Sequence, residues 1–191
     1  GCKQVIENHK PIIDIDPSWE MVELGEITNI STGKLNANAA SENGAYPFFT
    51  CSKEISKINE YTYDQECILL SGNNAAGNYD VKYYKGKFDA YQRVYIISLN
   101  EESKAKVDYQ ILYYSINQQL NILKNLSVGS LTRYLTLPIV QSIKIPIPQI
   151  SIQKEIIQKI EEEKKVIEGN KKLIEIYTQK IQDRINKVWG E

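Results

Sequence analysis

Residues 151–189 read SIQKEIIQKIEEEKKVIEGNKKLIEIYTQKIQDRINKVW, and this stretch decides the architecture that the sequence predicts. It contains no proline and only one glycine, Gly169, so nothing in it forces a helix to stop. At about 1.5 Å per residue, a single helix over these residues is on the order of 55 Å long. β-Branched residues recur at every seventh position: Ile160, Ile167, Ile174, Ile181 and Val188.

This repeat predicts that the helix pairs with another one, because an apolar stripe with a seven-residue period is buried when a second helix packs against it. The helix is also too long to bury against one small domain. Glu163 and Asn170 lie on the same seam, where polar residues reduce stability and set register. The alternative, a helix that folds back onto its own domain, stays open at this point.

The composition is that of an ordinary globular protein, with 42% apolar and 25% charged residues in a chain of 191. No apolar run approaches the roughly 20 residues of a membrane helix, and no secretory pattern opens the chain. We therefore expect a cytoplasmic protein without a membrane partner. The chain has 23 Lys and Arg residues and 24 Asp and Glu residues, so its net charge is near zero. This balance excludes a protein that coats phosphate backbones indiscriminately, and any contact with nucleic acid must use side chains at specific positions.

The rare residues exclude most catalytic chemistry. The one histidine, His9, lies in the polar lead-in, so a Ser-His-Asp arrangement has no base in the main body. Cys2, Cys51 and Cys67 are not spaced as metal ligands and are expected to be free thiols. There is no glycine-rich phosphate cradle. The sequence thus predicts no catalytic residue, no metal and no cofactor.

One enzymatic alternative remains open, because Asp64 and the pair Asp80 and Lys82 loosely imitate a magnesium-dependent nuclease site. Such combinations of common residues also arise by chance.

The rest of the chain predicts an α+β fold with a β-rich core. Residues 1–17 are a polar lead-in or linker, fenced by Pro11 and Pro17. Residues 107–126 have helical spacing. Short apolar or alternating runs predict strands at residues 21–27, 67–70, 94–99 and 143–148. We therefore predict one mixed α/β domain over residues 18–150, followed by the long coiled-coil helix over residues 151–189.

The loops between the expected strands are rich in Gly, Asn and Ser, and tyrosines alternate with lysines around them. Asn, Gln and Arg can form paired hydrogen bonds to base edges, and glycine-rich loops let amides approach phosphates. These features suit DNA contacts, but tyrosines also suit sheets and Asn-Gly loops also suit turns. From composition alone, both interpretations stay open. The suitable base readers are Asn73, Asn74, Gln92, Arg93 and Arg133.

Several motifs resemble the specificity (S) subunits of type I restriction-modification systems. The run 143–156, IKIPIPQISIQKEI, is similar to that family's junction between target-recognition domain and long helix. The run 128–135, VGSLTRYL, resembles its Gly-Ser/Thr loop, and Trp19 with Leu24-Gly25 resembles its opening. The turn at Gly33 and the Leu69–Gly72 strand end follow in the same order.

The resemblance implies a non-catalytic target-recognition domain, reading one half of a split double-stranded DNA sequence, and a helix that sets the half-site spacing. It implies methyltransferase (M) and restriction (R) subunits as partners, and a second recognition domain or a copy of this chain across the helix. The usual subunit has two such domains, so we expect a half-length subunit or a fragment, such as the C-terminal part of a fused methyltransferase-specificity polypeptide.

We expect DNA contacts from loops on one face of the domain. The rival interpretation is a coiled-coil protein-interaction adaptor with a β-rich head and no nucleic-acid role. The expected contact residues are Lys34, Ser71, Asn73, Asn74, Gln92, Arg93, Ser130, Thr132 and Arg133.

Overall fold

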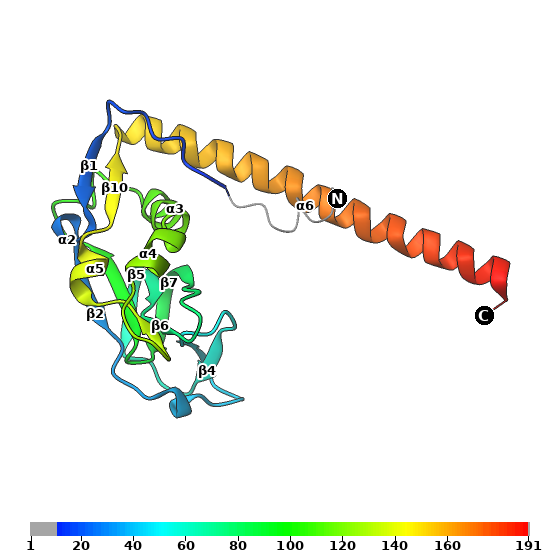
Figure 1. Ribbon diagram of the computed structural model, residues 1–191, viewed down its shortest axis with the longest axis horizontal. Coiled ribbons are helices and arrows are strands. Elements are labelled where there is room, and N and C mark those ends of the chain that lie inside the picture. The colour runs from blue at the N-terminus through cyan, green and yellow to red at the C-terminus, as the bar shows by residue number, and fades with distance from the viewer. Residues whose placement is uncertain (1–10, 191) are drawn as a thin grey trace. The chain divides into compact units, whose positions relative to one another are not determined.

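The structure is a computed structural model that describes residues 11–190. Residues 12–153 form one compact unit, and the chain from Lys154 onward belongs to another. The predicted α+β class is confirmed, with a sheet at the centre of the first unit and a long helix in the second (Figure 1). Cys2, His9 and most of the predicted lead-in lie outside the described residues.

A six-stranded sheet forms the body of the first unit. All neighbouring strands are antiparallel except β3 and β7, which run parallel over a short stretch. In spatial order the strands are β2 (Thr28–Thr32), β8 (Val94–Leu99), β5 (Tyr63–Ser71), β7 (Val81–Ala90), β3 (Tyr46–Phe49) and β4 (Ser56–Ile58).

One face of this sheet packs against helices α3 (Tyr109–Gln118) and α4 (Leu120–Leu126) and the short helix α5 (Leu137–Gln141). The larger core lies there, because alternate side chains of the central strands point to that face. Its fully buried members include Ile68, Leu70, Ile97, Leu112, Ile116 and Val140.

The other face holds a second apolar cluster, and the sheet curls. Phe88 pairs with Tyr63 at the start of β5, whereas Val94 pairs with Ser71 at its end. Along a flat strand these ends lie about 26 Å apart. The six-residue step from Phe88 to Val94 spans at most about 20–22 Å even when extended, and it contains a tight turn from Tyr91 to Val94. The strands must therefore bend to bring both pairings together.

Short elements complete the unit. Strands β1 (Glu20–Glu23) and β10 (Lys144–Ile147) pair antiparallel, so the start of the domain lies beside its end. An ion pair of 3.0 Å between Lys144 Nζ and Glu23 Oε1 spans the same pair of strands. The remaining elements are α2 (Leu24–Ile27), η1 (Ala37–Ala39), β6 (Asn73–Asn74) and β9 (Arg133–Tyr134).

Two predicted elements differ from the structure. The strand expected over residues 21–27 ends at Glu23, where the chain turns into α2 and buries Leu24. The helical spacing over residues 107–126 belongs to two helices, which break at Gln119. Its side-chain Nε2 donates to the carbonyl oxygens of Ser115, at 3.0 Å, and of Lys144, at 2.7 Å. The strands expected near residues 67–70, 94–99 and 143–148 are confirmed.

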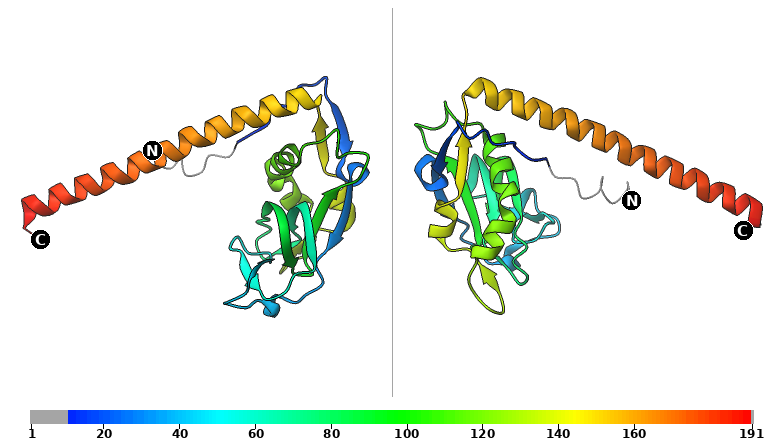
Figure 2. Two further views of the ribbon diagram at one scale, coloured as in Figure 1. Left: turned by 180° about the vertical axis from the view of Figure 1, so that it is seen from behind. Right: turned by 45° about the horizontal axis from the view of Figure 1, so that its top comes forward.

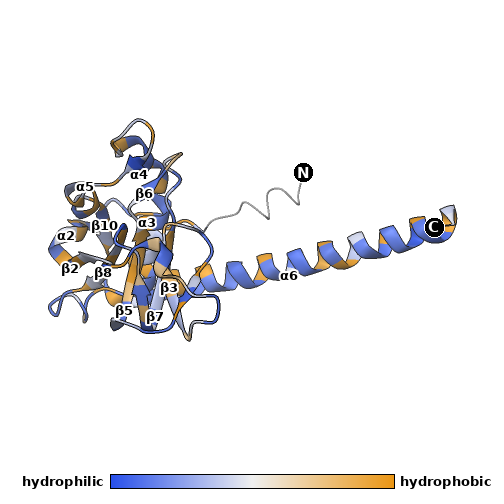
Figure 3. Cartoon of the chain, turned by 90° about the horizontal axis from the view of Figure 1, so that it is seen from below, coloured by the Kyte–Doolittle hydropathy of each residue, from blue (hydrophilic) through white to orange (hydrophobic). Residues whose placement is uncertain are grey.

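Helix α6 (Ile150–Trp189) matches the predicted long helix closely. The helix is mostly hydrophilic, with apolar residues recurring along its length (Figure 3). Its first turn belongs to the unit 12–153, where the side chain of Gln153 is fully buried. Gln153 Oε1 accepts from the Asp108 amide, while its Nε2 donates to the carbonyl oxygens of Lys106 and Pro148. Among the described residues, no helix is both long and apolar enough to cross a membrane.

Candidate nucleic-acid interface

Gly72 joins three of the loops that the sequence singles out. Its amide donates to the Arg93 carbonyl oxygen over 2.7 Å, and its own carbonyl oxygen accepts from the Leu135 amide over 2.8 Å. A Cβ at this position would lie 2.5 Å from the Arg93 oxygen, so only glycine permits the approach. The loop after β5, the turn before β8 and the segment after β9 therefore meet at one point.

The glycine-rich loop and the Gly-Ser loop pair directly. Asn73 lies opposite Tyr134 and Asn74 opposite Arg133 in the small β6–β9 sheet. Ser130 and Thr132 are exposed in the loop that leads into β9. The structure thus brings together five of the expected contact residues on neighbouring backbone.

Side-chain bonds hold this pair of loops in shape. Asn74 Oδ1 accepts from the amides of Ala76 and Asn78, at 2.9 and 3.1 Å. Lys124 Nζ donates to Asn78 Oδ1 over 2.9 Å, and Arg133 Nη1 donates to the Lys124 carbonyl oxygen over 3.1 Å. Asn74 and Arg133 are therefore partly engaged within the protein, and each keeps further donors for an external partner.

Lys34 and Gln92 lie in two further segments that connect to these loops through the backbone. Gly33 lies so close to β7 that a Cβ would be 2.1 Å from the Ala90 carbonyl oxygen. The Gln92 amide donates to the Leu35 carbonyl oxygen over 2.9 Å, and Gln92 Nε2 donates to Asn36 Oδ1 over 2.9 Å. Lys34 and Arg93 are exposed beside these bonds. A continuous series of backbone contacts therefore links Lys34 to Arg133.

Ser71 differs from its expected role. It is only 4% exposed, and its hydroxyl accepts a 2.7 Å hydrogen bond from the Asp80 amide. Its backbone amide also bonds to the Asp80 carbonyl oxygen. Ser71 thus supports the loop from inside and does not present its hydroxyl to solvent.

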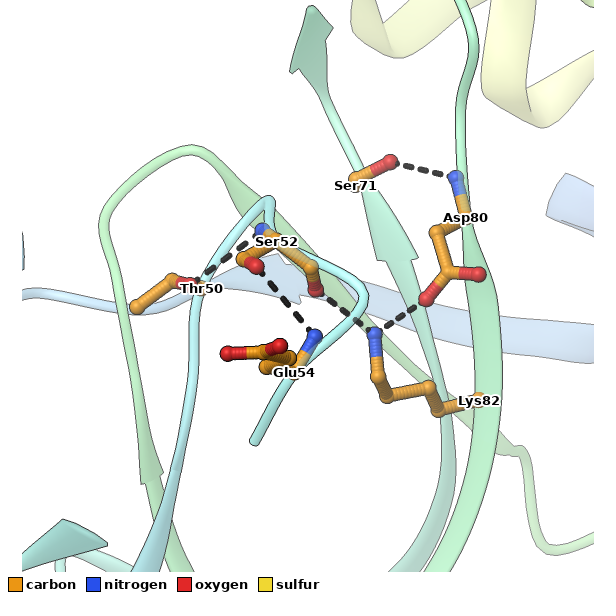
Figure 4. Close-up of polar contacts among 6 residues, drawn as sticks. All are labelled: Thr50, Ser52, Glu54, Ser71, Asp80 and Lys82. Atoms are coloured by element: carbon orange, nitrogen blue, oxygen red, sulfur yellow. Dashed lines mark hydrogen bonds and ion pairs between the residues drawn. The ribbon is translucent and has the colours of Figure 1, made fainter. Parts of the chain in front are cut away.

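The loop after β3 is a further part of the surface that the sequence did not reveal. Lys82 Nζ donates to the Ser52 carbonyl oxygen over 2.9 Å and forms an ion pair with Asp80 (Figure 4). Within the loop, Thr50 Oγ1 accepts from the Ser52 amide and Ser52 Oγ from the Glu54 amide. The only sequence signal is the cluster of small polar residues there, which is equally typical of any turn.

Cys51 links the same loop to the turn before β8. Its Sγ donates weakly to the Arg93 carbonyl oxygen at 3.5 Å, and burial raises the pKa of its thiol. Burial also raises the pKa of Cys67 to about 12, so that both thiols stay protonated at neutral pH. The expectation of free thiols holds for these two cysteines.

The nuclease alternative is not supported. Asp64 pairs with Lys87 near the start of β5, whereas Val81, next to Asp80, pairs with Leu70 near its end. The two carboxylates therefore lie at opposite ends of the strand. No group of three or more potential metal ligands forms among the described residues.

The stripe expected to pair helices is exposed over the C-terminal half of α6. Ile181 is 60% and Val188 is 72% exposed, and Tyr177, Ile185 and Trp189 line the same apolar surface. Ile167 and Ile174 are half-buried, and Ile160 is buried.

Comparison with known proteins gives a consistent result. The family model for the type I restriction modification DNA specificity domain matches residues 17–177. The type I restriction enzyme EcoDI specificity subunit of Escherichia coli is 37% identical over 157 residues, which are 82% of this chain and 34% of that protein. The chain thus spans about a third of the length of this relative.

Two solved structures share the fold. The S subunit of a type I restriction-modification system from M. genitalium has a TM-score of 0.59 at 15% identity, covering 73% of this chain and 37% of that one. The HsdS subunit from Thermoanaerobacter tengcongensis has a TM-score of 0.58 at 15% identity, covering 84% and 41%. The resemblance carried by the sequence motifs is therefore confirmed: this chain belongs to the type I restriction modification DNA specificity domain family.

Proposed function

We propose that this chain recognises one half of a split double-stranded DNA sequence through the surface whose loops meet at Gly72. The observation that carries the proposal is the convergence of Lys34, Arg93 and Arg133 with amide side chains on one backbone network. Arginine and lysine suit phosphates or guanine, while Asn and Gln suit adenine. Family membership supports DNA as the ligand.

Each part of the chain has a distinct role in this proposal. Residues 18–150 form the target-recognition domain, and residues 151–189 form a spacer that pairs with the helix of a second recognition domain or of another copy. The module itself performs no chemistry and directs methyltransferase and restriction subunits to the site. The exposed apolar stripe around Ile181 and Val188 supports the pairing.

Affinity selection from a random duplex library tests the proposal, with the full chain as bait at modest salt. We expect enrichment of a motif of about 3–5 base pairs, with each mismatch costing roughly 1–3 kcal/mol. Affinity should fall steeply as salt rises, because bound phosphates release counterions. Two motif copies at fixed spacing would indicate a helix-paired dimer.

Selection is repeated with the methyltransferase subunit present, since that subunit can supply further backbone contacts. If no motif is enriched either with the chain alone or with the methyltransferase subunit present, the proposal is contradicted. It would leave the chain as an adaptor whose only partners are proteins. A coiled-coil contact of that kind should change little with salt, which separates the two functions in a second way.

A further inference from the structure

The tip of the Gly-Ser hairpin carries an unusually exposed leucine. The hairpin closes where the backbones of Val128 and Tyr134 exchange hydrogen bonds of 3.1 and 2.9 Å. Leu131, between them, is 91% exposed; among the described large apolar side chains the next most exposed is Trp189, at 79%. Figure 2 (right) shows this hairpin projecting from the rest of the fold.

The tip is held rather than loose. Gly129 adopts a φ of +102°, and a Cβ there would lie 2.2 Å from the Thr132 carbonyl oxygen, so the turn is tightly closed. At the base, the Arg133 guanidinium bonds to the Lys124 carbonyl oxygen, and the Leu135 amide bonds to Gly72. The backbone on either side of Leu131 is therefore held by the same network that holds the expected DNA contacts.

The groups around Leu131 point to the kind of partner it meets. Ser130 and Thr132 flank it with exposed hydroxyls, and Arg133 and Lys124 add positive charge at the base of the hairpin. Hydroxyl and cationic donors suit phosphate oxygens. Here an apolar side chain lies among groups that can donate hydrogen bonds to phosphates. Many proteins that bend DNA insert such an apolar side chain between neighbouring base pairs and unstack them. An apolar protein surface would not need these donors.

We propose that Leu131 is an intercalating wedge, which enters the target duplex between two base pairs and unstacks them. The hydroxyls of Ser130 and Thr132 hold the phosphates beside the opened step. This inference rests on the proposed DNA recognition and adds a mechanism to it. It also predicts selectivity at a position without base contacts, because flexible pyrimidine–purine steps open most easily.

The test uses the full chain and the duplex recovered by selection, with 2-aminopurine in place of each adenine in turn, in and beside the motif and on either strand. Its fluorescence rises when the base loses its stacking partners. We expect the wild-type chain to raise the signal at one step. Leu131→Ala should abolish the rise and weaken binding about tenfold, while Leu131→Phe should retain it. Ile122→Ala is the matched control, since Ile122 is 55% exposed on α4 and outside the hairpin.

The outcomes separate this inference from the function on which it rests. If no duplex is selected even with the methyltransferase subunit, both fail. If a motif is selected but 2-aminopurine stays silent at every position, recognition stands and the wedge is wrong. The wedge is also wrong if Leu131→Ala keeps the fluorescence signal and instead loses binding to the methyltransferase subunit, since Leu131 is then a protein contact.

Discussion

The amide of Gly72 donates a 2.7 Å hydrogen bond to the carbonyl oxygen of Arg93, and this bond holds the glycine-rich loop against the turn before β8. The Cys51 thiol approaches the same oxygen, and Leu135 bonds to the other side of Gly72. The turn that carries Arg93 and the segment that follows Arg133 therefore both bond to the backbone of one glycine, which makes that position sensitive to any added atom.

Gly72→Ala should destabilise the fold, because the new Cβ would lie 2.5 Å from the Arg93 oxygen and the two loops must separate. We expect a loss of about 1–3 kcal/mol in the free energy of unfolding, measured by urea denaturation. Gly169→Ala is the matched control, since a Cβ there has nothing within 4 Å. It should stabilise α6 by about 0.5–1 kcal/mol. Equal effects of the two variants would contradict this explanation.

Lys82→Met should loosen the loop after β3, because it removes both the ion pair with Asp80 and the bond to the Ser52 carbonyl oxygen. We expect faster hydrogen exchange at Ser52 and Glu54, with a stability loss of about 1.5–3 kcal/mol. Lys85→Met is the control, since Lys85 is 70% exposed and pairs with Glu66 at the surface. Its loss should be under about 1 kcal/mol. Unchanged exchange in Lys82→Met would show that Lys82 does not hold the loop.

Stability should fall at alkaline pH because burial raises the pKa of the Cys67 thiol from 9.0 to about 12. Above pH 9 the unfolded chain has lost this proton while the folded chain keeps it, so unfolding becomes easier as pH rises towards 12. The slope from this group is at most about 1.4 kcal/mol per pH unit. Cys67→Ala should remove that part of the slope. Parallel curves for the two proteins between pH 9 and 11 would contradict it.

Helix pairing should depend on the exposed stripe of α6. Ile181→Glu combined with Val188→Glu places two charges on this stripe. We expect sedimentation to show a dimer for the wild-type chain and a monomer for this variant. Gln179→Glu with Gln182→Glu adds the same charge on other faces of the helix and should leave the dimer intact. If the stripe variant keeps the wild-type mass, the chain does not pair through this surface.

Local patterns allowed much of the fold to be predicted from the sequence. The long helix follows from its periodicity, β5 and β8 from compact apolar runs close to turn residues, and β10 from alternation stopped by Pro146 and Pro148. The break at Gln119 could not be predicted in this way, because its side chain bonds to Lys144, a residue far along the chain. The change from strand to helix at Leu24 has the same origin, since the Leu24 amide bonds to the Ile143 carbonyl oxygen.

The candidate site could be predicted as loops but not as an assembled surface. Gly, Asn and Ser mark where the chain turns, whereas the sheet curl that brings those turns together depends on pairings between distant strands. Ser71 illustrates the limit, because a serine at a loop start gives no sign that its hydroxyl is buried against Asp80. Lys82 shows the converse, since a lysine in an alternating strand looks like an ordinary solvated residue.

Selection with Arg93→Ala, run beside the wild-type chain, tests the central claim most directly. The Arg93 side chain is exposed while its carbonyl oxygen holds Gly72, so the variant keeps the backbone bond and removes only the side chain beyond Cβ, with its guanidinium. We predict a motif that loses preference at one base position, with about 1–3 kcal/mol less discrimination there. A uniform weakening would make Arg93 a phosphate contact within the same surface. An unchanged motif at unchanged affinity would contradict the claim that the loops meeting at Gly72 read DNA.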